Sequence, residues 1–223
     1  MAPSRYRLYS PPGSFFAFAP LVVSEFADVS LEIVSTDDDI EEIIASKSPT
    51  GKAPILETKT GEVIVSSQAI AKFLANLRRD TDLLGSGSLR DTVAIDDWTN
   101  WAAQELELPV CVSYYMATEC IGFDESNFNK AKEDIECGLS VLESHLQKEG
   151  SSIENTPAQN YLVLPDQVTL ADIVIACYLV YPFTLFFDET ELKKFPTVVS
   201  WFENCTQQPE FFSVLGKIEC GKK

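Results

Sequence analysis

Two short polar stretches bracket a pair of predicted strands between Ser48 and Arg79. Lys52-Ala53-Pro54 comes directly before the apolar pair Ile55-Leu56, and Ser66-Ser67 comes directly before a helical pattern. Proline cannot donate into a sheet, so Pro54 marks the first residue or the edge of a strand. Ser67 is expected to cap the helix, whose first N–H groups have no acceptor inside it. The two stretches together predict a shelf of backbone donors suited to a carboxylate.

The other reactive side chains form no catalytic or metal-binding pattern. The only histidine, His145, lies on a predicted helix and belongs to no acid–nucleophile pattern, and we interpret it as structural. The cysteines show no CxxC and no paired metal spacing, which predicts buried or free thiols, with a redox or interchain role as the alternative. They are Cys111, Cys120, Cys137, Cys177, Cys205 and Cys220. No phosphate-binding loop is visible, and we expect no metal.

The charge is strongly acidic and unevenly distributed. The net charge is −17 over 223 residues; residues 1–80 carry 8 basic and 11 acidic side chains, whereas residues 81–223 carry 9 and 23. Such a surface repels phosphate backbones, which argues against direct nucleic-acid binding and favours a basic protein partner or simply a soluble acidic surface. No apolar run approaches the ~20 residues that span a bilayer. The opening MAPSRYRLYS lacks a signal-peptide core, so we expect a cytoplasmic protein.

Strand and helix signals alternate in the first eighty residues, in the order β-α-β-α-β-β-α. Helices are expected at Phe15–Phe26, capped by Ser14 and kinked or restarted at Pro20, at the acidic run DDDIEEII, and from Ser67 onward. Strands are expected at Arg5–Tyr9, Val29–Ser35, Ile55-Leu56 and Val63–Val65, with a turn at Thr60-Gly61 between the last two. This pattern indicates a small α/β layer with a mixed sheet.

The rest of the chain carries helical signals only. After a Gly- and Ser-rich linker, helices are expected from Leu89 to about Tyr115, interrupted at Pro109, and at Asp124–Lys148. A capping box at Thr169–Asp172 opens an almost wholly apolar helix, and two short helices follow between residues 195 and 216. We therefore expect an α/β domain at 1–80, a linker at 81–88 and an all-α domain at 89–223.

Three motifs carry a family resemblance: GKAPIL at residues 51–56, SSQAI at 66–70 and TLADI at 169–173. Through them the chain resembles the cytosolic glutathione S-transferases along nearly its whole length. The resemblance implies the glutathione S-transferase fold, with an α/β thioredoxin-like N-terminal domain plus an all-α C-terminal domain. It also implies a cis peptide before Pro54, a minority state that only a fold can hold.

The tail FPTVVSWFENCTQQPEFFSVLG and the opening LYSPPGSFFAF are similar to the transferase-like domain of the elongation factor 1 gamma family. That resemblance implies a scaffold in translation elongation, which binds the nucleotide-exchange subunit of the elongation factor 1 complex. It further implies a homodimer formed through the third and fourth helices, and a native chain that continues past Lys223. A transferase-like appendage of an aminoacyl-tRNA synthetase is a third hypothesis, which the tail pattern disfavours.

The resemblance also implies a glutathione site. Its residues would be Ser14 as the thiol-activating hydroxyl with Tyr9 as the lesser candidate, Lys52 for the glycyl carboxylate, Ala53 and Pro54 for the cysteinyl unit, and Ser66 and Ser67 for the γ-glutamyl end. Each has a structural alternative: Ser14 and Ser67 as helix caps, Tyr9 as a packing residue, Pro54 as a requirement of the fold and Lys52 as a surface lysine.

Ser66 departs from the family pattern, which has an acidic or amide residue there. A serine hydroxyl would forgo a charge-assisted hydrogen bond of about 1.5–3 kcal/mol to the γ-glutamyl ammonium. The sequence thus favours a scaffold with a weak or vestigial glutathione site and no cofactor. The alternative is an active transferase that conjugates glutathione to electrophiles.

Overall fold

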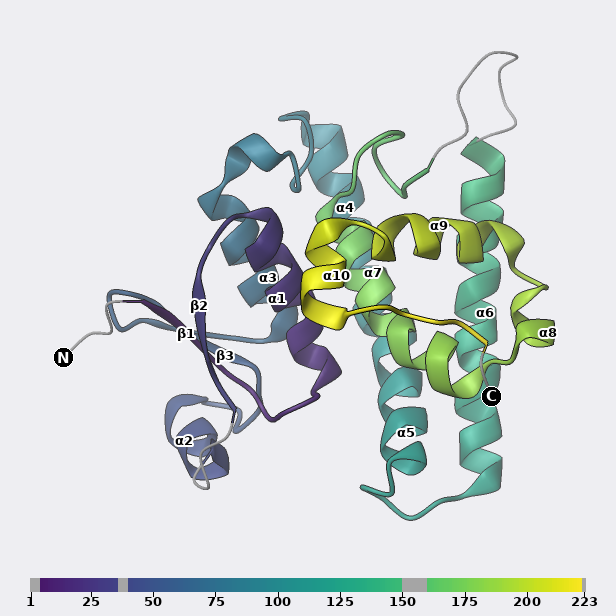
Figure 1. Ribbon diagram of the computed structural model, residues 1–223, viewed down its shortest axis with the longest axis horizontal. Coiled ribbons are helices and arrows are strands. Elements are labelled where there is room, and N and C mark those ends of the chain that lie inside the picture. The colour runs from purple at the N-terminus through teal and green to yellow at the C-terminus, as the bar shows by residue number, and fades with distance from the viewer. Residues whose placement is uncertain (1–4, 36–39, 150–159, 222–223) are drawn as a thin grey trace. The chain divides into compact units, whose positions relative to one another are not determined.

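The computed structural model describes residues 5–35, 40–149 and 160–221 (Figure 1). The chain divides into two compact units, Met1–Leu84 and Gly85–Lys223. The first unit contains strands and helices, and every regular element that is described in the second is helical. This is the thioredoxin-like plus all-α architecture that the sequence predicts.

A four-stranded mixed sheet forms the centre of the first unit. Its strands are β1 (Tyr6–Tyr9), β2 (Leu31–Val34), β3 (Ile55–Glu57) and β4 (Val63–Val65). Their spatial order is β2-β1-β3-β4, with β1 parallel to β2 and antiparallel to β3, and β3 antiparallel to β4. The predicted hairpin is confirmed, because the Gly61 N–H donates to Thr58 O (2.9 Å) within the β3–β4 turn.

The helices of the first unit follow the predicted order with shifted boundaries. They are α1 (Phe18–Phe26), α2 (Ile40–Lys47) and α3 (Ser67–Leu77), with 3-10 turns at Phe15–Ala17 and Arg79–Thr81. The helical stretch predicted at Phe15–Phe26 is present, but its first three residues form a 3-10 turn and α1 begins at Phe18. Pro20 lies in the first turn of α1, where a missing N–H costs little. The acidic residues 37–39 lie outside the described residues.

Alternating side chains place apolar residues on both faces of the sheet. Tyr9 and Ile55 pack with Ile44 of α2 on one face, where they form a small buried cluster. Leu8 and Leu56, which are fully buried, belong to the other face, and α1 packs there against α3 (Figure 1). Both faces of the sheet are therefore covered.

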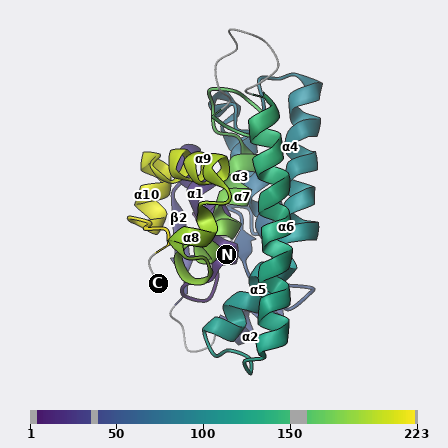
Figure 2. The same ribbon diagram turned by 90° about the vertical axis from the view of Figure 1, so that its right-hand side faces the viewer.

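The second unit is built on a long helical hairpin. Its helices are α4 (Leu89–Trp101), α5 (Glu107–Ala117), α6 (Glu125–Glu149), α7 (Leu170–Tyr181), α8 (Glu189–Leu192), α9 (Pro196–Thr206) and α10 (Pro209–Leu215), with π-helical turns η3 (Ala102–Leu106) and η4 (Pro182–Phe186). The turn η3 joins α4 to α5 without a break, and α6 runs alongside both η3 and α5 (Figure 2).

Pro109 interrupts the first of these helices less sharply than the sequence predicts. The helix continues through η3, and Pro109 lies in the first turn of α5. A proline removes one backbone donor, and a π-helical turn upstream accommodates the resulting change of hydrogen-bond register. The helix expected from Leu89 to about Tyr115 is thus present without a gap, but its backbone hydrogen-bond pattern changes at η3.

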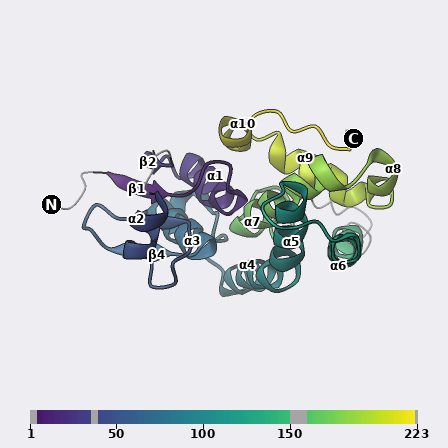
Figure 3. The same ribbon diagram turned by 90° about the horizontal axis from the view of Figure 1, so that it is seen from below.

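Helix α7 is the core of the second unit. Its residues from Leu170 to Val180 are all buried, and α4, α5 and α9 pack around it (Figure 3). The predicted capping box is confirmed: Thr169 is the N-cap, and its N–H donates to Asp172 Oδ2 (2.9 Å). The predicted pair of C-terminal helices is confirmed as α9 and α10, whereas α8 was not foreseen.

A carboxylate from α6 caps helix α9. Glu143, only 8% exposed, accepts hydrogen bonds from the N–H groups of Thr197 (3.1 Å) and Val198 (2.8 Å). These donors lie in the first turn of α9, where no acceptor exists within the helix. A tertiary contact thus replaces the local capping side chain that α9 lacks.

We expect Glu143→Ala to lower the free energy of unfolding by about 2 kcal/mol, because two buried N–H groups lose a charged acceptor. Urea unfolding followed by circular dichroism would measure the change as a lower midpoint at an unchanged slope. Glu133→Ala, on an exposed position of the same helix, is the matched control. Equal midpoints for the two variants would contradict the capping role.

Candidate functional site

The strand register brings the two polar stretches of the sequence to one end of the sheet. Tyr9 at the end of β1 pairs with Ile55 at the start of β3, and Ile55 pairs with Val65 at the end of β4. The segments after β1, before β3 and after β4 must therefore leave the sheet at the same end of its strands. We call the residues of these segments, Ser10–Ser14, Lys52–Pro54 and Ser66-Ser67, the sheet-end site.

The segment before β3 is held by buried polar contacts. The peptide between Ala53 and Pro54 is cis, as predicted, and Pro54 is buried. The Ser48 hydroxyl, 5% exposed, accepts from the N–H groups of Thr50 and Lys52, both at 3.3 Å. The Lys52 side chain is exposed, and its ammonium forms no ion pair with the described residues. It is therefore in a position to meet an anionic ligand.

The N-cap of the helix after β4 lies one residue earlier than the sequence predicts. Ser66, not Ser67, is the N-cap of α3, and Ser67 is the first helical residue. The reason is the backbone of Ser66, whose φ of 77° is incompatible with the right-handed helix. The exposed Ser66 side chain makes no capping hydrogen bond within the described part of the chain. The first-turn N–H groups of α3 thus face the sheet-end site without a side-chain cap from Ser66.

Ser14 lies in the segment after β1 as the N-cap of the 3-10 turn, not of the long helix that was predicted. Its backbone is engaged: the Ser14 N–H donates to Pro11 O (3.3 Å), and its carbonyl accepts from the Ala17 N–H (3.0 Å). Its hydroxyl makes no capping bond in the described structure. The structure therefore holds the Ser14 backbone in place while its half-buried hydroxyl is not used as a cap.

Tyr9 is committed to a different partner. Its hydroxyl donates to Glu57 Oε2 at 2.6 Å, and Lys47 approaches Glu57 Oε1 at 3.3 Å from α2. The Lys47 ammonium also lies 5.3 Å from the centre of the Tyr9 ring. Burial and the hydrogen bond to Glu57 raise the pKa of Tyr9. This hydroxyl is less suited to stabilising a thiolate than the hydroxyl of Ser14.

The sequence reasoning missed Lys47, Glu57 and Ser48, which organise the surroundings of the sheet-end site. The contact of Glu57 could have been predicted from the sequence. Glu57 lies two positions after Ile55 on the same strand, so both side chains face the side of the sheet that carries Tyr9. Lys47 ends α2 and has no local pattern that would predict its contact. Ser48 looks like an ordinary loop residue in the sequence.

The Tyr9–Glu57–Lys47 cluster should make the stability of the first unit depend on pH. The hydrogen bond from Tyr9 lowers the pKa of Glu57 below its ordinary value of 4.5, with Lys47 contributing. The cluster therefore stabilises the fold above pH 4.5, and this stabilisation is lost as the pH falls through the lower pKa of the folded state. We expect Glu57→Gln to reduce this acid-side loss, measured as thermal midpoints between neutral pH and pH 3. Parallel pH profiles for the two proteins would contradict it.

The buried polar groups of the second unit serve structural contacts. His145 Nε2 lies 2.9 Å from the Leu162 carbonyl and packs edge-on against Trp98, which agrees with a structural role. All six cysteines are free thiols. Over residues 5–35, 40–149 and 160–221, no group of three or more histidine, cysteine or acidic side chains is placed to hold a metal. No helix in the same ranges combines the length and the apolar character that crossing a bilayer requires.

Comparison with known families identifies both halves of the sequence. Residues 4–76 match the family described as "Glutathione S-transferase, N-terminal domain", and residues 104–209 match "Glutathione S-transferase, C-terminal domain". The glutathione S-transferase-like protein FUS3 of Gibberella fujikuroi is 30% identical over 205 residues, which cover 90% of this chain and 91% of that protein.

Other curated relatives are elongation factors. Elongation factor 1-gamma-A of Xenopus laevis is 27% identical over 223 residues, which cover 96% of this chain and 48% of the relative. Elongation factor 1-gamma of Artemia salina is 28% identical over 221 residues, with 97% and 48% coverage. The chain thus spans about half the length of these elongation factor relatives.

Solved structures show the same fold. The glutathione S-transferase-like domain of elongation factor 1-gamma from Saccharomyces cerevisiae superposes with a TM-score of 0.79 at 19% identity, covering 99% of this chain and 97% of that one. Ure2p in complex with glutathione superposes with a TM-score of 0.78 at 18% identity, covering 95% and 99%. At these identities the likeness establishes the architecture alone.

Proposed function

The chain belongs to the glutathione S-transferase family, and on that premise we propose that it is a protein-binding module of the elongation factor 1 gamma type. In this role it organises the guanine-nucleotide-exchange complex of translation elongation in the cytoplasm. The observation that carries the proposal is the likeness to elongation factor 1-gamma over 96% of the chain. The acidic second unit, which suits a basic protein partner, supports it.

The sheet-end site supports a binding role over an efficient enzyme. Ser66 stands where the family resemblance implies an acidic or amide side chain, and its hydroxyl has no charge to offer an ammonium group. Tyr9 is held by Glu57, so Ser14 is the remaining candidate for thiol activation. Glutathione binding at this site is accordingly weak in our proposal, and the chain keeps the transferase fold without efficient transferase activity.

The proposed partner is the nucleotide-exchange subunit of the elongation factor 1 complex, and the proposed assembly includes a homodimer. Apolar side chains exposed on α3 and, separately, on α4 support dimerisation, because burial against a second copy would remove them from water. Leu77 is 39% exposed on α3, and Leu89 and Val93 are 79% and 49% exposed on α4. Sedimentation that shows only monomer at all concentrations would refute the dimer.

Co-purification tests the main proposal. The full chain, immobilised through a terminal tag, should retain the N-terminal region of the exchange subunit at physiological salt. It should do so without measurable conjugation of glutathione to a generic electrophile. A chain that turns over the electrophile briskly and retains no exchange subunit would contradict the scaffold role.

An active glutathione transferase is the second candidate. Three observations favour it: the Ser14 hydroxyl makes no capping bond within the described structure, the peptide before Pro54 is cis, and a transferase-like protein is 30% identical. The neighbour Ure2p was solved with glutathione bound. Calorimetric titration at near-physiological glutathione concentrations would measure binding. If turnover is present, Ser14→Ala should abolish it, whereas Ser126→Ala on the exposed surface of α6 should not.

A further inference from the structure

The segments on the two sides of β3 have the same sequence pattern. Ser48-Pro49-Thr50-Gly51-Lys52 precedes the strand, and Thr58-Lys59-Thr60-Gly61-Glu62 follows it. Each begins with a hydroxyl residue and has threonine, glycine and a charged residue at the same three later positions. Serine at the first position, proline at the second and glycine at the fourth are favoured in a type I turn. We call these segments the Ser48 turn and the Thr58 turn.

A buried hydroxyl organises the Ser48 turn. The Ser48 side chain, 5% exposed, accepts hydrogen bonds from the N–H groups of Thr50 and Lys52, and its oxygen lies 3.1 Å from Thr50 Oγ1. A serine hydroxyl has two lone pairs and one hydrogen, so the two N–H groups occupy the lone pairs and leave the hydrogen for Thr50 Oγ1. The Gly51 N–H closes the turn on Ser48 O (3.1 Å), and the Gly51 φ of 65° is one that other residues rarely adopt.

The Thr58 turn repeats these contacts at the other end of β3. The Glu62 N–H donates to Thr58 Oγ1 (3.1 Å), and the Gly61 N–H donates to Thr58 O (2.9 Å). The Thr58 side chain is buried as well, and its oxygen lies 2.9 Å from Thr60 Oγ1. The final charged residues differ, because Glu62 accepts a hydrogen bond from the Thr60 hydroxyl (3.1 Å), whereas the Lys52 side chain is exposed and forms no ion pair with the described residues. The Ser48 turn thus holds the backbone of Lys52 and leaves its side chain in solvent.

The Ser48 turn is fixed at both of its ends. The Ser48 N–H donates to the α2 carbonyl four residues earlier (2.8 Å), so the turn continues directly from the end of α2. Lys47 holds that end of α2 against the sheet through its contact with Glu57 (3.3 Å). At the other end of the segment, Pro54 is buried directly before β3. The turn therefore sets where the backbone of Lys52 lies relative to the sheet.

We propose that Ser48 is a positioning residue of the sheet-end site, whose hydroxyl holds Lys52 where its ammonium meets the carboxylate at the glycyl end of glutathione. Ser48 is buried and acts on the ligand only through the backbone of Lys52. The inference rests on the glutathione binding that the proposed function retains in weak form, and it adds a residue that sets the strength of that binding. A turn that keeps Lys52 in one backbone conformation lowers the ordering cost of binding.

Removing the Ser48 hydroxyl should weaken binding more than it weakens the fold. Thr50 and Lys52 are exposed, so water can accept their N–H groups when the hydroxyl is absent. We expect Ser48→Ala to lower the affinity for glutathione roughly five- to tenfold, measured by NMR titration of the full chain, with a small change in the urea midpoint. Ser48→Thr keeps the hydroxyl and should keep most of the affinity. An affinity unchanged in Ser48→Ala would overturn the proposal.

The Thr58 turn supplies the matched control. Thr58→Ala removes the equivalent hydroxyl from an equally buried position at the opposite end of β3. It should shift the urea midpoint about as much as Ser48→Ala and leave the affinity for glutathione unchanged. Equal losses of affinity in Ser48→Ala and Thr58→Ala would overturn the proposal, because the effect would then come from a general loosening around β3.

A modified ligand tests whether the effect of Ser48 passes through Lys52. Glutathione whose glycyl carboxylate is converted to an amide keeps the other groups of the ligand and offers no charge to the Lys52 ammonium. Ser48→Ala should weaken binding of this amide less than about twofold, and it should add equally little to the loss that Lys52→Ala causes with glutathione. Equal losses for glutathione and its amide would give Ser48 a purely structural role and overturn the inference.

The exchange subunit separates this inference from the proposed function. If the wild-type chain retains that subunit but binds no glutathione in the NMR titration, the positioning role fails and the scaffold role stands. If the wild-type chain retains no exchange subunit, while Ser48→Ala affects glutathione and spares its amide, the scaffold role fails and the positioning role stands.

Discussion

Replacing Asp172 by alanine should lower the free energy of unfolding by about 4 kcal/mol, the largest effect we expect from any single substitution. The Asp172 carboxylate is completely buried at the start of α7 and accepts four hydrogen bonds. The donors are the Leu162 N–H (2.8 Å), the Trp201 indole N–H (2.9 Å), the Thr169 N–H (2.9 Å) and the Thr169 hydroxyl (2.7 Å).

These contacts join three segments of the second unit at one side chain. The loop before α7, the first turn of α7 and the middle of α9 all depend on the same carboxylate. Burial raises the pKa of Asp172, whereas the hydrogen bonds from Trp201, Leu162 and Thr169 favour its ionised form. Without the carboxylate, two backbone N–H groups and an indole N–H stay buried with no acceptor, and each costs about 1–3 kcal/mol.

Asp172→Asn distinguishes hydrogen bonding from packing, because asparagine keeps the volume and loses one acceptor. We expect it to cost about 2 kcal/mol or more, since its amide N–H₂ would face a donor wherever it points. Urea unfolding would measure both variants, with Asp166→Ala on the exposed loop nearby as the control. An Asn variant as stable as the wild type would show that the hydrogen bonds contribute little.

Replacing Ser66 by glutamate should tighten glutathione binding roughly ten- to hundredfold, the largest functional change that we expect. A carboxylate at this N-cap position would offer the γ-glutamyl ammonium a charge-assisted hydrogen bond worth about 1.5–3 kcal/mol. Ser66 already has a φ of 77°, so glutamate inherits the same backbone cost and adds no new strain. The gain in affinity should therefore reflect the new side chain alone.

Isothermal titration calorimetry with the full chain would measure this gain, with Ser66→Ala as the control that adds no charge. Glutathione lacking its γ-glutamyl amino group provides a second control, because it should bind the Ser66→Glu variant and the wild-type chain about equally well. An unchanged affinity in Ser66→Glu would mean that glutathione does not reach this end of the sheet. The proposed sheet-end site would then lose its γ-glutamyl subsite.

Much of the first unit could be predicted because its signals are local. The strand order along the chain, the turn at Thr60-Gly61 and the helix after Ser66 depend on residues a few positions apart. The boundaries were less accurate for a physical reason. Whether Ser66 or Ser67 caps α3 depends on a positive φ imposed by the sharp turn out of β4, which residue type does not reveal.

The assignment of the candidate hydroxyls needed the tertiary structure. Tyr9 and Ser14 were both candidates in the sequence, and the structure engages the Tyr9 hydroxyl with Glu57, 48 residues away. The Ser14 hydroxyl, expected to cap a helix, makes no such bond in the described structure. A long-range contact thus engages one of the two candidate hydroxyls, and this is why our proposal favours Ser14.

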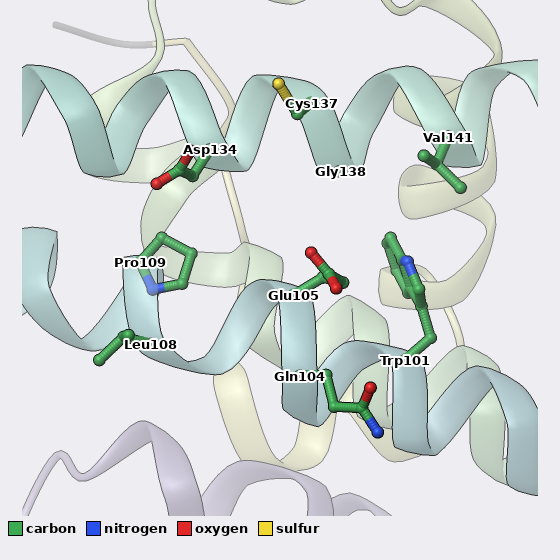
Figure 4. A pocket seen from close by; sticks show the side chains of 9 residues that line it. All are labelled: Trp101, Gln104, Glu105, Leu108, Pro109, Asp134, Cys137, Gly138 and Val141. Carbon is green, nitrogen blue, oxygen red and sulfur yellow. The ribbon is translucent and has the colours of Figure 1, made fainter.

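The sequence by itself determined the two-part architecture and the capping box of α7, because each depends on side chains that are neighbours along the chain or on its composition. Its motifs indicated the family, and through that resemblance they implied the cis peptide before Pro54, which the structure contains. Only the tertiary structure decided which polar groups are engaged, as when Glu143 caps a helix that begins more than fifty residues later. It also formed the hollow between η3–α5 and α6, which Trp101 and Val141 line from two different helices (Figure 4). Contacts of this kind depend on how helices and strands pack, and packing is a property of the whole fold rather than of any segment.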